Sequence, residues 1–285
     1  MMTGGLMAYL FWFITLILFS SLEVVSKPVM GLIDPFTMTF MRFFIGGLFL
    51  MLLNGFTRKK QKIRMTGRDF ILILLTGSLN SIVSMTLLQF SIKFGNASSA
   101  ATLISTNPIF TALFAALIIK EDLPKRKLIG ILTGFTGILV FGFGMLEGDT
   151  LSGILLGVAS AVTFALYSVL MKTFVSRYGS LRCTAYSAFF PSVIYGAALW
   201  CSGTLKIPVL TPSNWLIVLY LGIFVTGIAY VCLMEAIKRM GATRAATLFY
   251  LKPVLATLLA SFFLSESVGI LKISGMIIII FSLFL

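Results

Sequence analysis

Runs of apolar residues about 20 long follow one another along this chain, and only short polar segments separate them. A helix of about 20 apolar residues crosses the hydrocarbon core of a bilayer. The pattern therefore predicts ten transmembrane helices. We place them at Met7–Val25, Pro35–Leu53, Phe70–Ile92, Ala97–Ile119, Leu128–Met145, Gly153–Met171, Cys183–Cys201, Trp215–Ala236, Ala245–Leu264 and Gly269–Leu285.

The second half of the sequence repeats the first at a shift of 145 residues. Without a gap, Gly77–Val140 and Gly222–Leu285 share 15 identities in 64 positions. The matched pairs include Gly77 with Gly222, Pro108 with Pro253, Glu121 with Glu266, Lys127 with Lys272 and Gly130 with Gly275. Two related halves of this kind are a common construction in secondary transporters, which bind their substrate between the halves.

The repeat divides the chain into residues 1–148 and 149–285, with five predicted spans in each. An odd number of spans places the second half in the membrane upside down relative to the first. We therefore predict an all-α membrane protein whose ten transmembrane helices form two inverted five-helix repeats.

Composition and charge support this prediction. Hydrophobic residues make up 59% of the chain and charged residues only 11%. The net charge of +13 comes from basic residues gathered in alternate loops, which marks the cytoplasmic side. Both termini are thus predicted to be cytoplasmic, in a multi-pass protein of the cell membrane with no nucleic-acid partner. Those loops contain Arg58, Lys59, Lys60, Lys62, Arg64 and Arg68; Lys120, Lys125, Arg126 and Lys127; Lys172, Arg177 and Arg182; Lys238, Arg239 and Arg244.

The sequence lacks the residues that an enzyme or a metal site would need. It contains no histidine, and most of its nine acidic residues lie in loops or at the ends of spans. The cysteines Cys183, Cys201 and Cys232 are interpreted as small buried residues rather than as a disulfide or metal site. We expect no catalytic residues, no metal and no cofactor.

One motif recurs in both halves. The stretch Asn107-Pro108-Ile109-Phe110-Thr111-Ala112-Leu113, which runs into Lys120-Glu121, returns as Lys252-Pro253-Val254-Leu255-Ala256-Thr257-Leu258 followed by Ser265-Glu266. Together with Arg42, these residues resemble the EamA-type branch of the drug/metabolite transporter superfamily. The resemblance implies a ten-helix transporter of inverted repeats, with substrates among amino acids, other metabolites, nucleotide derivatives and drugs. The turn after Glu266 lacks the basic residues of its counterpart, as expected for a turn that faces outside.

Two ionisable residues lie inside the first two spans. Arg42 is seven residues into the second span, and Glu23 is at a similar depth in the first. Charges inside a membrane are costly and by default indicate a transport pathway. The pair is interpreted either as a gate or substrate anchor, or as an ion pair that holds the two helices together.

Lys252 is the strongest candidate for substrate contact, because it is the only charge next to a proline inside a span. A proline frees a backbone carbonyl and kinks a helix, which membranes tolerate where the backbone lines a cavity. Pro108, next to Asn107, is its counterpart in the first half. Each half thus offers a helix kink and a polar side chain at related depth. The alternatives are kinks that serve packing alone and a lysine that extends its ammonium to the interface.

Further polar and aromatic residues complete the predicted cavity. Asn80 and Ser84 are four residues apart and therefore share one helical face. Tyr167 and Tyr230 lie in the sixth and eighth spans, each four residues after a threonine, and Trp12 lies in the first. A single polar residue of this kind often bonds only its own backbone. The pattern on three helices nevertheless favours a cavity.

These observations predict a secondary transporter that moves small metabolites, amino acids or related polar and amphipathic compounds, by alternating access. The family resemblance favours efflux. Proton coupling would use Glu23, and facilitated diffusion or exchange is equally compatible with the sequence. Its partners are a small-molecule substrate and the bilayer, and both a monomer and a homodimer stay open. The alternative function is a membrane scaffold or regulatory subunit that does not transport.

Overall fold

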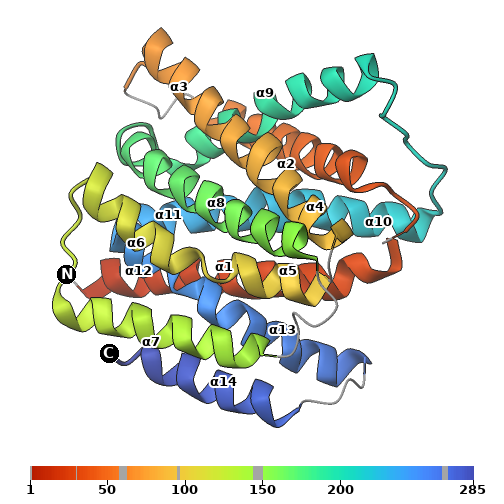
Figure 1. Cartoon of the computed structure of the whole chain (residues 1–285). Coiled ribbons are helices and arrows are strands. Elements are labelled where there is room, and N and C mark those ends of the chain that lie inside the picture. The colour runs from red at the N-terminus through yellow and green to blue at the C-terminus, as the bar shows by residue number, and fades with distance from the viewer. Residues whose placement is uncertain (1, 30, 58–62, 95–96, 144–149, 265–268) are drawn as a thin grey trace.

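The protein consists of helices packed side by side (Figure 1). The structure, a computed structural model, describes residues 2–29, 31–57, 63–94, 97–143, 150–264 and 269–285. Apolar sequence of this length becomes helical because a helix pairs its backbone polar groups within one segment, which a bilayer requires.

The helices of the first half match the predicted segments. They are α1 (Met2–Ser26), the short 3-10 helix η1 (Lys27–Val29), α2 (Pro35–Thr57), α3 (Gly67–Ser78), η3 (Leu79–Ser84), α4 (Met85–Phe94), α5 (Ala97–Ile104), α6 (Asn107–Ile118) and α7 (Lys125–Gly142). The third predicted span comprises α3, η3 and α4, and the fourth comprises α5 and α6.

The second half follows the same order. Its helices are α8 (Leu151–Tyr178), α9 (Ser180–Cys201), α10 (Pro212–Tyr220), η4 (Leu221–Ile228), α11 (Ala229–Met240), α12 (Ala242–Ala246), α13 (Leu248–Leu264) and α14 (Ile270–Ser282). Six helical stretches of the described chain are long and apolar enough to cross a membrane, and Ile270–Ser282 is a shorter apolar helix. The prediction of an all-α membrane fold is confirmed, whereas the count of ten spans stays a prediction.

Equivalent helices of the two halves pack against each other in matching pairs. α7 runs along α14, and α2 along α9, as Figure 1 shows at its lower and upper edges. Likewise α1 contacts α11 and α13, while α8 contacts α4 and α6. Under the shift of 145 residues, the pairs α7–α14 and α2–α9 map onto themselves, and the contacts of α1 map onto those of α8. The chain therefore folds with an internal pseudo-twofold arrangement of its helices, as inverted repeats do.

Two hydrogen bonds repeat this relation at the level of single atoms. Ser160 donates to the backbone oxygen of Ser84 at 2.9 Å. The Thr15 hydroxyl lies 3.3 Å from the backbone oxygen of Ala229 and shares its hydrogen with the backbone oxygen of Phe11, at 2.8 Å in its own helix. Ser160 and Ala229 are the counterparts of Thr15 and Ser84 under the 145-residue shift. All four are buried. The two halves thus use the same contact to fix a helix against its neighbour.

A π-helical segment interrupts the third and eighth predicted spans at related positions. η3 (Leu79–Ser84) corresponds to residues 224–229, which overlap η4 (Leu221–Ile228). The wider turn leaves one residue outside the regular α-helical ladder, and such segments are frequent at functional sites. Both segments face α2 or α8 in the interior of the protein.

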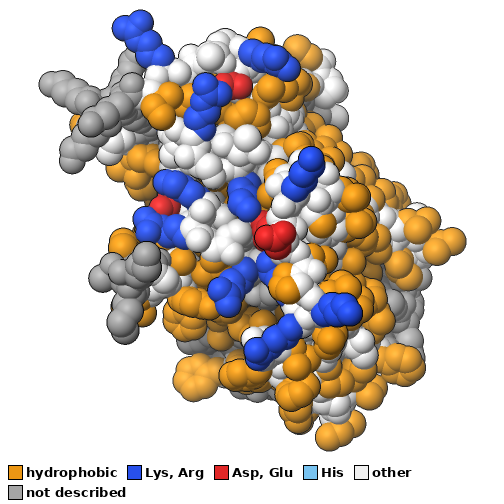
Figure 2. Space-filling model, turned by 90° about the vertical axis from the view of Figure 1, so that its left-hand side faces the viewer, with side chains coloured by type: hydrophobic (Ala, Val, Ile, Leu, Met, Phe, Trp, Pro, Cys, Tyr) orange, Lys and Arg blue, Asp and Glu red, His pale blue; other side chains and the backbone are white. Residues whose placement is uncertain are grey.

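Both ends of the chain lie on the left-hand side of Figure 1, and Figure 2 shows that this side carries many Lys and Arg side chains around a few carboxylates. We call it the basic face; its residues include Lys127, Lys172, Arg177, Arg182, Arg239 and Arg244. By the charge rule this face is predicted to be cytoplasmic.

Candidate functional site

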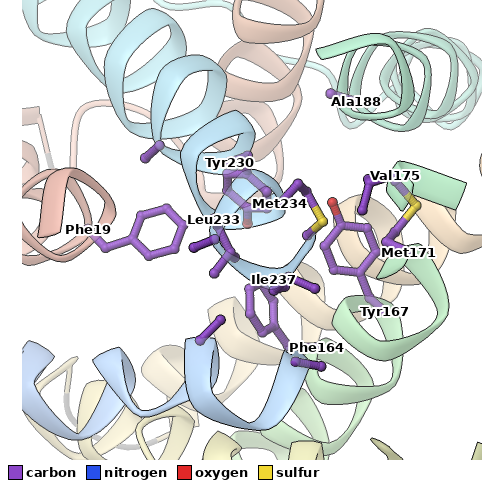
Figure 3. Packing of buried hydrophobic residues seen from close by; sticks show 14 of the residues in the cluster. Phe19, Phe164, Tyr167, Met171, Val175, Ala188, Tyr230, Leu233, Met234 and Ile237 are labelled. Carbon is purple, nitrogen blue, oxygen red and sulfur yellow. The ribbon is translucent and has the colours of Figure 1, made fainter. Parts of the chain in front are cut away.

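Six aromatic side chains from both halves meet in the interior. They are Phe19 of α1, Phe43 of α2, Phe164 and Tyr167 of α8, Tyr230 of α11 and Phe249 of α13, here called the Tyr230 cluster. The Tyr230 ring lies 5.3 Å from Phe19, 5.8 Å from Phe43, 6.3 Å from Phe164 and 6.4 Å from Tyr167, measured between centroids. Figure 3 shows Phe19 and Tyr167 on opposite sides of Tyr230.

The rings of the Tyr230 cluster touch one another directly. Most of the pairs are edge-to-face, and aromatic pairs at these separations are favourable contacts. No ligand fits between rings that are already in contact, so this conformation is closed at its centre. A substrate would enter only after the two halves move apart.

Arg42 connects the cluster to the second half. Its side chain is only 8% exposed, and its Nε donates to Thr226 Oγ1 of η4 at 3.3 Å. The Tyr230 hydroxyl also interacts with the Arg42 charge. The predicted pairing of Arg42 with Glu23 is not tested, because the Glu23 side chain lies outside the described residues.

Asn80 brings an amide to the same hydroxyl. It lies in η3, is 2% exposed, and its side chain interacts with Tyr230. Its Oδ1 is buried without a hydrogen-bond partner. An unsatisfied buried acceptor costs about 1–3 kcal/mol, so each one calls for an explanation. Three predicted site residues, Asn80, Tyr167 and Tyr230, are therefore in one place, beside Arg42.

Lys252 lies next to the cluster on α13, one turn after Phe249 and directly before Pro253. The lysine is 7% exposed, and its backbone oxygen accepts a hydrogen bond from Ser20 of α1 at 3.3 Å. Pro253 lies inside α13, whereas Pro108 occupies the first turn of α6, after a break in the helix at Ser105 and Thr106. A proline is well tolerated in a first turn, where its missing N–H is not needed. Both spans are therefore interrupted, but in different ways.

Ser84 and Asn107 are engaged in helix packing. Ser84 donates to the backbone oxygen of Ser160 at 3.0 Å and accepts the return bond. The Asn107 amide donates to the backbone oxygen of Ala161 at 3.2 Å, and its Oδ1 accepts from Thr111 at 3.0 Å. Both are fully buried. In this conformation they hold η3 and α6 against α8.

Trp12 packs against the core that contains the Tyr230 cluster and also lines a cavity. Together with Tyr9, Lys127, Arg244 and Tyr250 it lines a space of about 750 Å³ at the basic face. The Arg244 guanidinium lies 5.9 Å from the Tyr9 ring centroid. The predicted cavity-lining residues thus separate into a central group, a packing group and Trp12. Among the described residues, no three carboxylates or cysteines gather as a metal would require.

Glu121 was not among the predicted site residues, although its match with Glu266 was a signal. Its carboxylate bonds Lys172 at 2.7 Å and Lys127 at 3.2 Å, and accepts from the backbone N–H groups of Ala242 at 3.0 Å and Thr243 at 3.2 Å. We call these five residues the Glu121 clasp. It ties the end of α6 to α7, α8 and α12 on the basic face.

The geometry of the Glu121 clasp depends on a glycine and on charge. Gly241 has φ +92°, and a Cβ there would lie 2.8 Å from Glu121 Oε1. Burial alone raises the pKa of Glu121, but the hydrogen bond and charge of Lys172, with the bonds from Thr243 and Ala242, outweigh it and lower the pKa to about 2. The carboxylate is therefore ionised at any physiological pH.

Comparison with known proteins agrees with this architecture. The EamA-like transporter family matches residues 6–143 and again 151–285. An uncharacterized transporter of Clostridium kluyveri is 33% identical over 95% of this chain and 90% of its own length. A protein of Rickettsia felis named S-adenosylmethionine uptake transporter is 26% identical over 94% of this chain and 88% of its own. A crystal structure with 23% identity superimposes with a TM-score of 0.81, covering 97% of this chain and 96% of the other.

Proposed function

The chain belongs to the EamA-like transporter family of the drug/metabolite transporter superfamily, and we propose that it carries amino acids or related amphipathic metabolites across the cell membrane. The substrate would bind at the Tyr230 cluster, between the two halves. The cluster supports this proposal because six helical segments of both halves supply it with aromatic rings, two buried cations and an amide.

The two cations indicate the charge of the substrate. Arg42 and Lys252 flank the cluster from α2 and α13, and both are more than nine-tenths buried. A buried cation favours a ligand that brings a carboxylate or phosphate. The rings suit an apolar side chain, and their negative faces suit a cation. An amphipathic amino acid or a derivative of one combines these features. S-adenosylmethionine, for which the Rickettsia relatives are named, is such a derivative.

Transport by alternating access follows from the inverted halves. In this conformation the rings are closed and the Glu121 clasp joins four helices on the basic face. Rocking of one half against the other would break one set of contacts and form its counterpart. The family resemblance favours efflux, whereas the Rickettsia relatives are named for uptake. The direction is measured with proteoliposomes loaded on either side.

Thermal-shift screening of the purified chain identifies the ligand. The panel contains the amino acids, their desamino analogues and S-adenosylmethionine, since a ligand that binds only the folded state raises the melting temperature. Lys252→Gln should then weaken the ligand by about tenfold to hundredfold, the loss of one charged hydrogen bond. Lys252→Arg should recover part of this loss, because a guanidinium presents different geometry. Lys206→Ala, in an exposed loop, is the control.

Equal affinity of wild type and Lys252→Gln for every ligand would make Lys252 a structural residue. Cysteine labelling distinguishes a transporter from a membrane scaffold that does not transport. Single cysteines at Ser84, Tyr230 and Lys252 are buried here, so they react in membranes only if the protein opens. A transporter should label at these positions and lose labelling at Tyr230 and Lys252 when substrate is added. A scaffold should stay unlabelled.

A further inference from the structure

One buried polar atom beside the Tyr230 cluster has no hydrogen-bond partner. Asn80 Oδ1 is enclosed by η3 and its neighbours and makes no hydrogen bond, although the Asn80 side chain also interacts with the Tyr230 hydroxyl. Asp34, Arg182 and Thr184 also have one unpaired buried atom each. The other atoms of Asp34 and Arg182 act at the N-terminus of α2 and in a bond to the backbone of Ile63. Among these four residues, Asn80 is the one whose side chain interacts with Tyr230.

The fold itself does not require an amide at this position. Under the 145-residue shift, Asn80 corresponds to Val225, which lies buried in the π-helical segment of the second half. The same local structure therefore forms around an apolar side chain. In the first half, the polar residue is retained despite the cost of burying its oxygen.

The surroundings of Asn80 define the missing partner. An amide oxygen accepts hydrogen bonds and cannot donate them, so its partner must carry an N–H or O–H group. Tyr230 is in ring contact with Phe19, Phe43, Phe164 and Tyr167. Aromatic faces attract ammonium groups. These two features together favour an amino group over a hydroxyl.

We propose that the Asn80 amide oxygen binds the amino group of the substrate, so that the site selects α-amino acids and their derivatives over the corresponding desamino acids. This inference rests on the proposed function. It assigns to Asn80 the discrimination between α-amino acids and carboxylates that lack the amino group. In the proposed function Lys252 binds the substrate carboxylate, and Asn80 would bind the amino group. The contact forms when the rings open for substrate.

The test compares matched ligands on matched variants. Binding of each amino acid in the panel, S-adenosylmethionine included, is measured against its desamino analogue with full-length protein in detergent. Wild type should prefer the amino compound by about tenfold or more. Asn80→Val, the residue of the other half, should abolish this preference by weakening the amino compound alone, while the desamino compound keeps its affinity within about twofold. Asn80→Asp, which keeps an acceptor, should retain the preference.

Ser81→Ala is the control within the same segment. Its hydroxyl is equally buried but already donates to the backbone oxygen of Gly77 at 3.0 Å. This variant should bind both ligands like wild type. Melting temperature and a monodisperse elution profile identify any variant that fails to fold. If Asn80→Val fails, Asn80→Ala, which also removes the acceptor, takes its place in the comparison.

The outcomes separate this inference from the proposed function. If wild type binds neither amino nor desamino acids, the proposed function fails. If it binds both with equal affinity, and Asn80→Val does the same, the function stands and the role of Asn80 is overturned. In that case a trapped water satisfies the amide oxygen. An equal loss of both ligands in Asn80→Val also overturns the amino-group assignment.

Discussion

The two halves of this protein share their framework but differ in their chemistry. The hydrogen bonds of Thr15 and Ser160 are counterparts, as are Phe19 and Phe164 in the Tyr230 cluster. The polar residues in and beside the cluster have no identical counterpart. Arg42, Asn80, Tyr167, Tyr230 and Lys252 correspond under the shift to Ser187, Val225, Leu22, Met85 and Asn107.

This difference indicates where selection for function acts. Each half must pack the same helices, so its framework contacts recur. A small metabolite has no twofold symmetry, so the groups that bind it need occur only once. Polar groups inside a membrane span are costly and are retained where they act. Residues unique to one half are therefore the candidates for binding, and residues common to both are the candidates for packing and gating.

Arg42→Ala should have the largest effect of any single substitution. It removes a buried guanidinium and leaves Thr226 without its bond to Arg42. Breaking a buried charged contact typically costs about 3–5 kcal/mol. We expect loss of folded protein or at least a tenfold loss of transport, measured by fluorescence-detected size exclusion and vesicle uptake. Lys206→Ala should behave like wild type.

Normal expression and transport by Arg42→Ala would show that this residue is neither gate nor brace. The double variant Glu23→Gln with Arg42→Met distinguishes the two roles. Restored folding without transport would assign the pair to function, and restored transport would assign it to structure.

Tyr230→Met places the residue of the first half at the centre of the cluster. It removes four ring contacts, each worth about 0.5–1.5 kcal/mol beyond burial, so both melting temperature and ligand affinity should fall. Tyr230→Phe keeps the rings and removes only the hydroxyl that meets Asn80 and Arg42. It should lower affinity by about fivefold, equivalent to one hydrogen bond, with little change in stability. Equal stability loss in both variants would contradict a binding role for the hydroxyl.

The sequence was sufficient for the framework because apolar run length and the repeat determine helices and their order. It also singled out Asn80, Tyr167, Tyr230 and Arg42, since polar residues inside spans are conspicuous; the fold brings them together, and their role in binding stays a prediction. Spacing along one helix cannot show which neighbour a side chain meets. Ser84 and Asn107 share the polar signature, yet they bond α8. Trp12 lines the cavity at the basic face, and its position in the sequence could not show this because it depends on how the helices pack.

Glu121 shows the opposite limit of the sequence. Its repeat match was visible, but the contact with the N–H groups of Ala242 and Thr243, 121 and 122 residues away, depends on the fold. No local pattern links α6 to the start of α12. Contacts between distant segments at the ends of helices could therefore not be predicted.

Thr15→Val and Ser160→Ala test the shared framework directly. Each removes the hydroxyl of one of two corresponding contacts between helices, so each should lower the free energy of unfolding by about 1 kcal/mol. The Ser160 bond is shorter, and its loss should cost slightly more. Substrate affinity should be unchanged in both, as measured by thermal shift with and without ligand. A selective loss of affinity in one variant would end the distinction between framework and binding residues.

The smallest effect concerns the Glu121 clasp, which the shared Glu121–Glu266 pair assigns to the framework. The pKa of Glu121 is lowered to about 2 from its usual 4.5. A group whose folded pKa is depressed contributes its full stability above the unfolded pKa and loses it as pH falls towards the folded pKa. The melting-temperature difference between wild type and Glu121→Gln should thus be constant from pH 5 to 8 and shrink below about 4.5.

Because the ion pairs of the clasp are partly exposed, that difference should not exceed a few degrees. Lys206→Ala, compared with wild type across the same pH range, corrects for the general effect of acid. Glu121→Gln should leave the ranking of ligands unchanged, since no residue of the clasp belongs to the Tyr230 cluster. A changed ranking of ligand affinities would place Glu121, a residue common to both halves, among those that bind substrate. The distinction between framework residues and binding residues would then fail at Glu121.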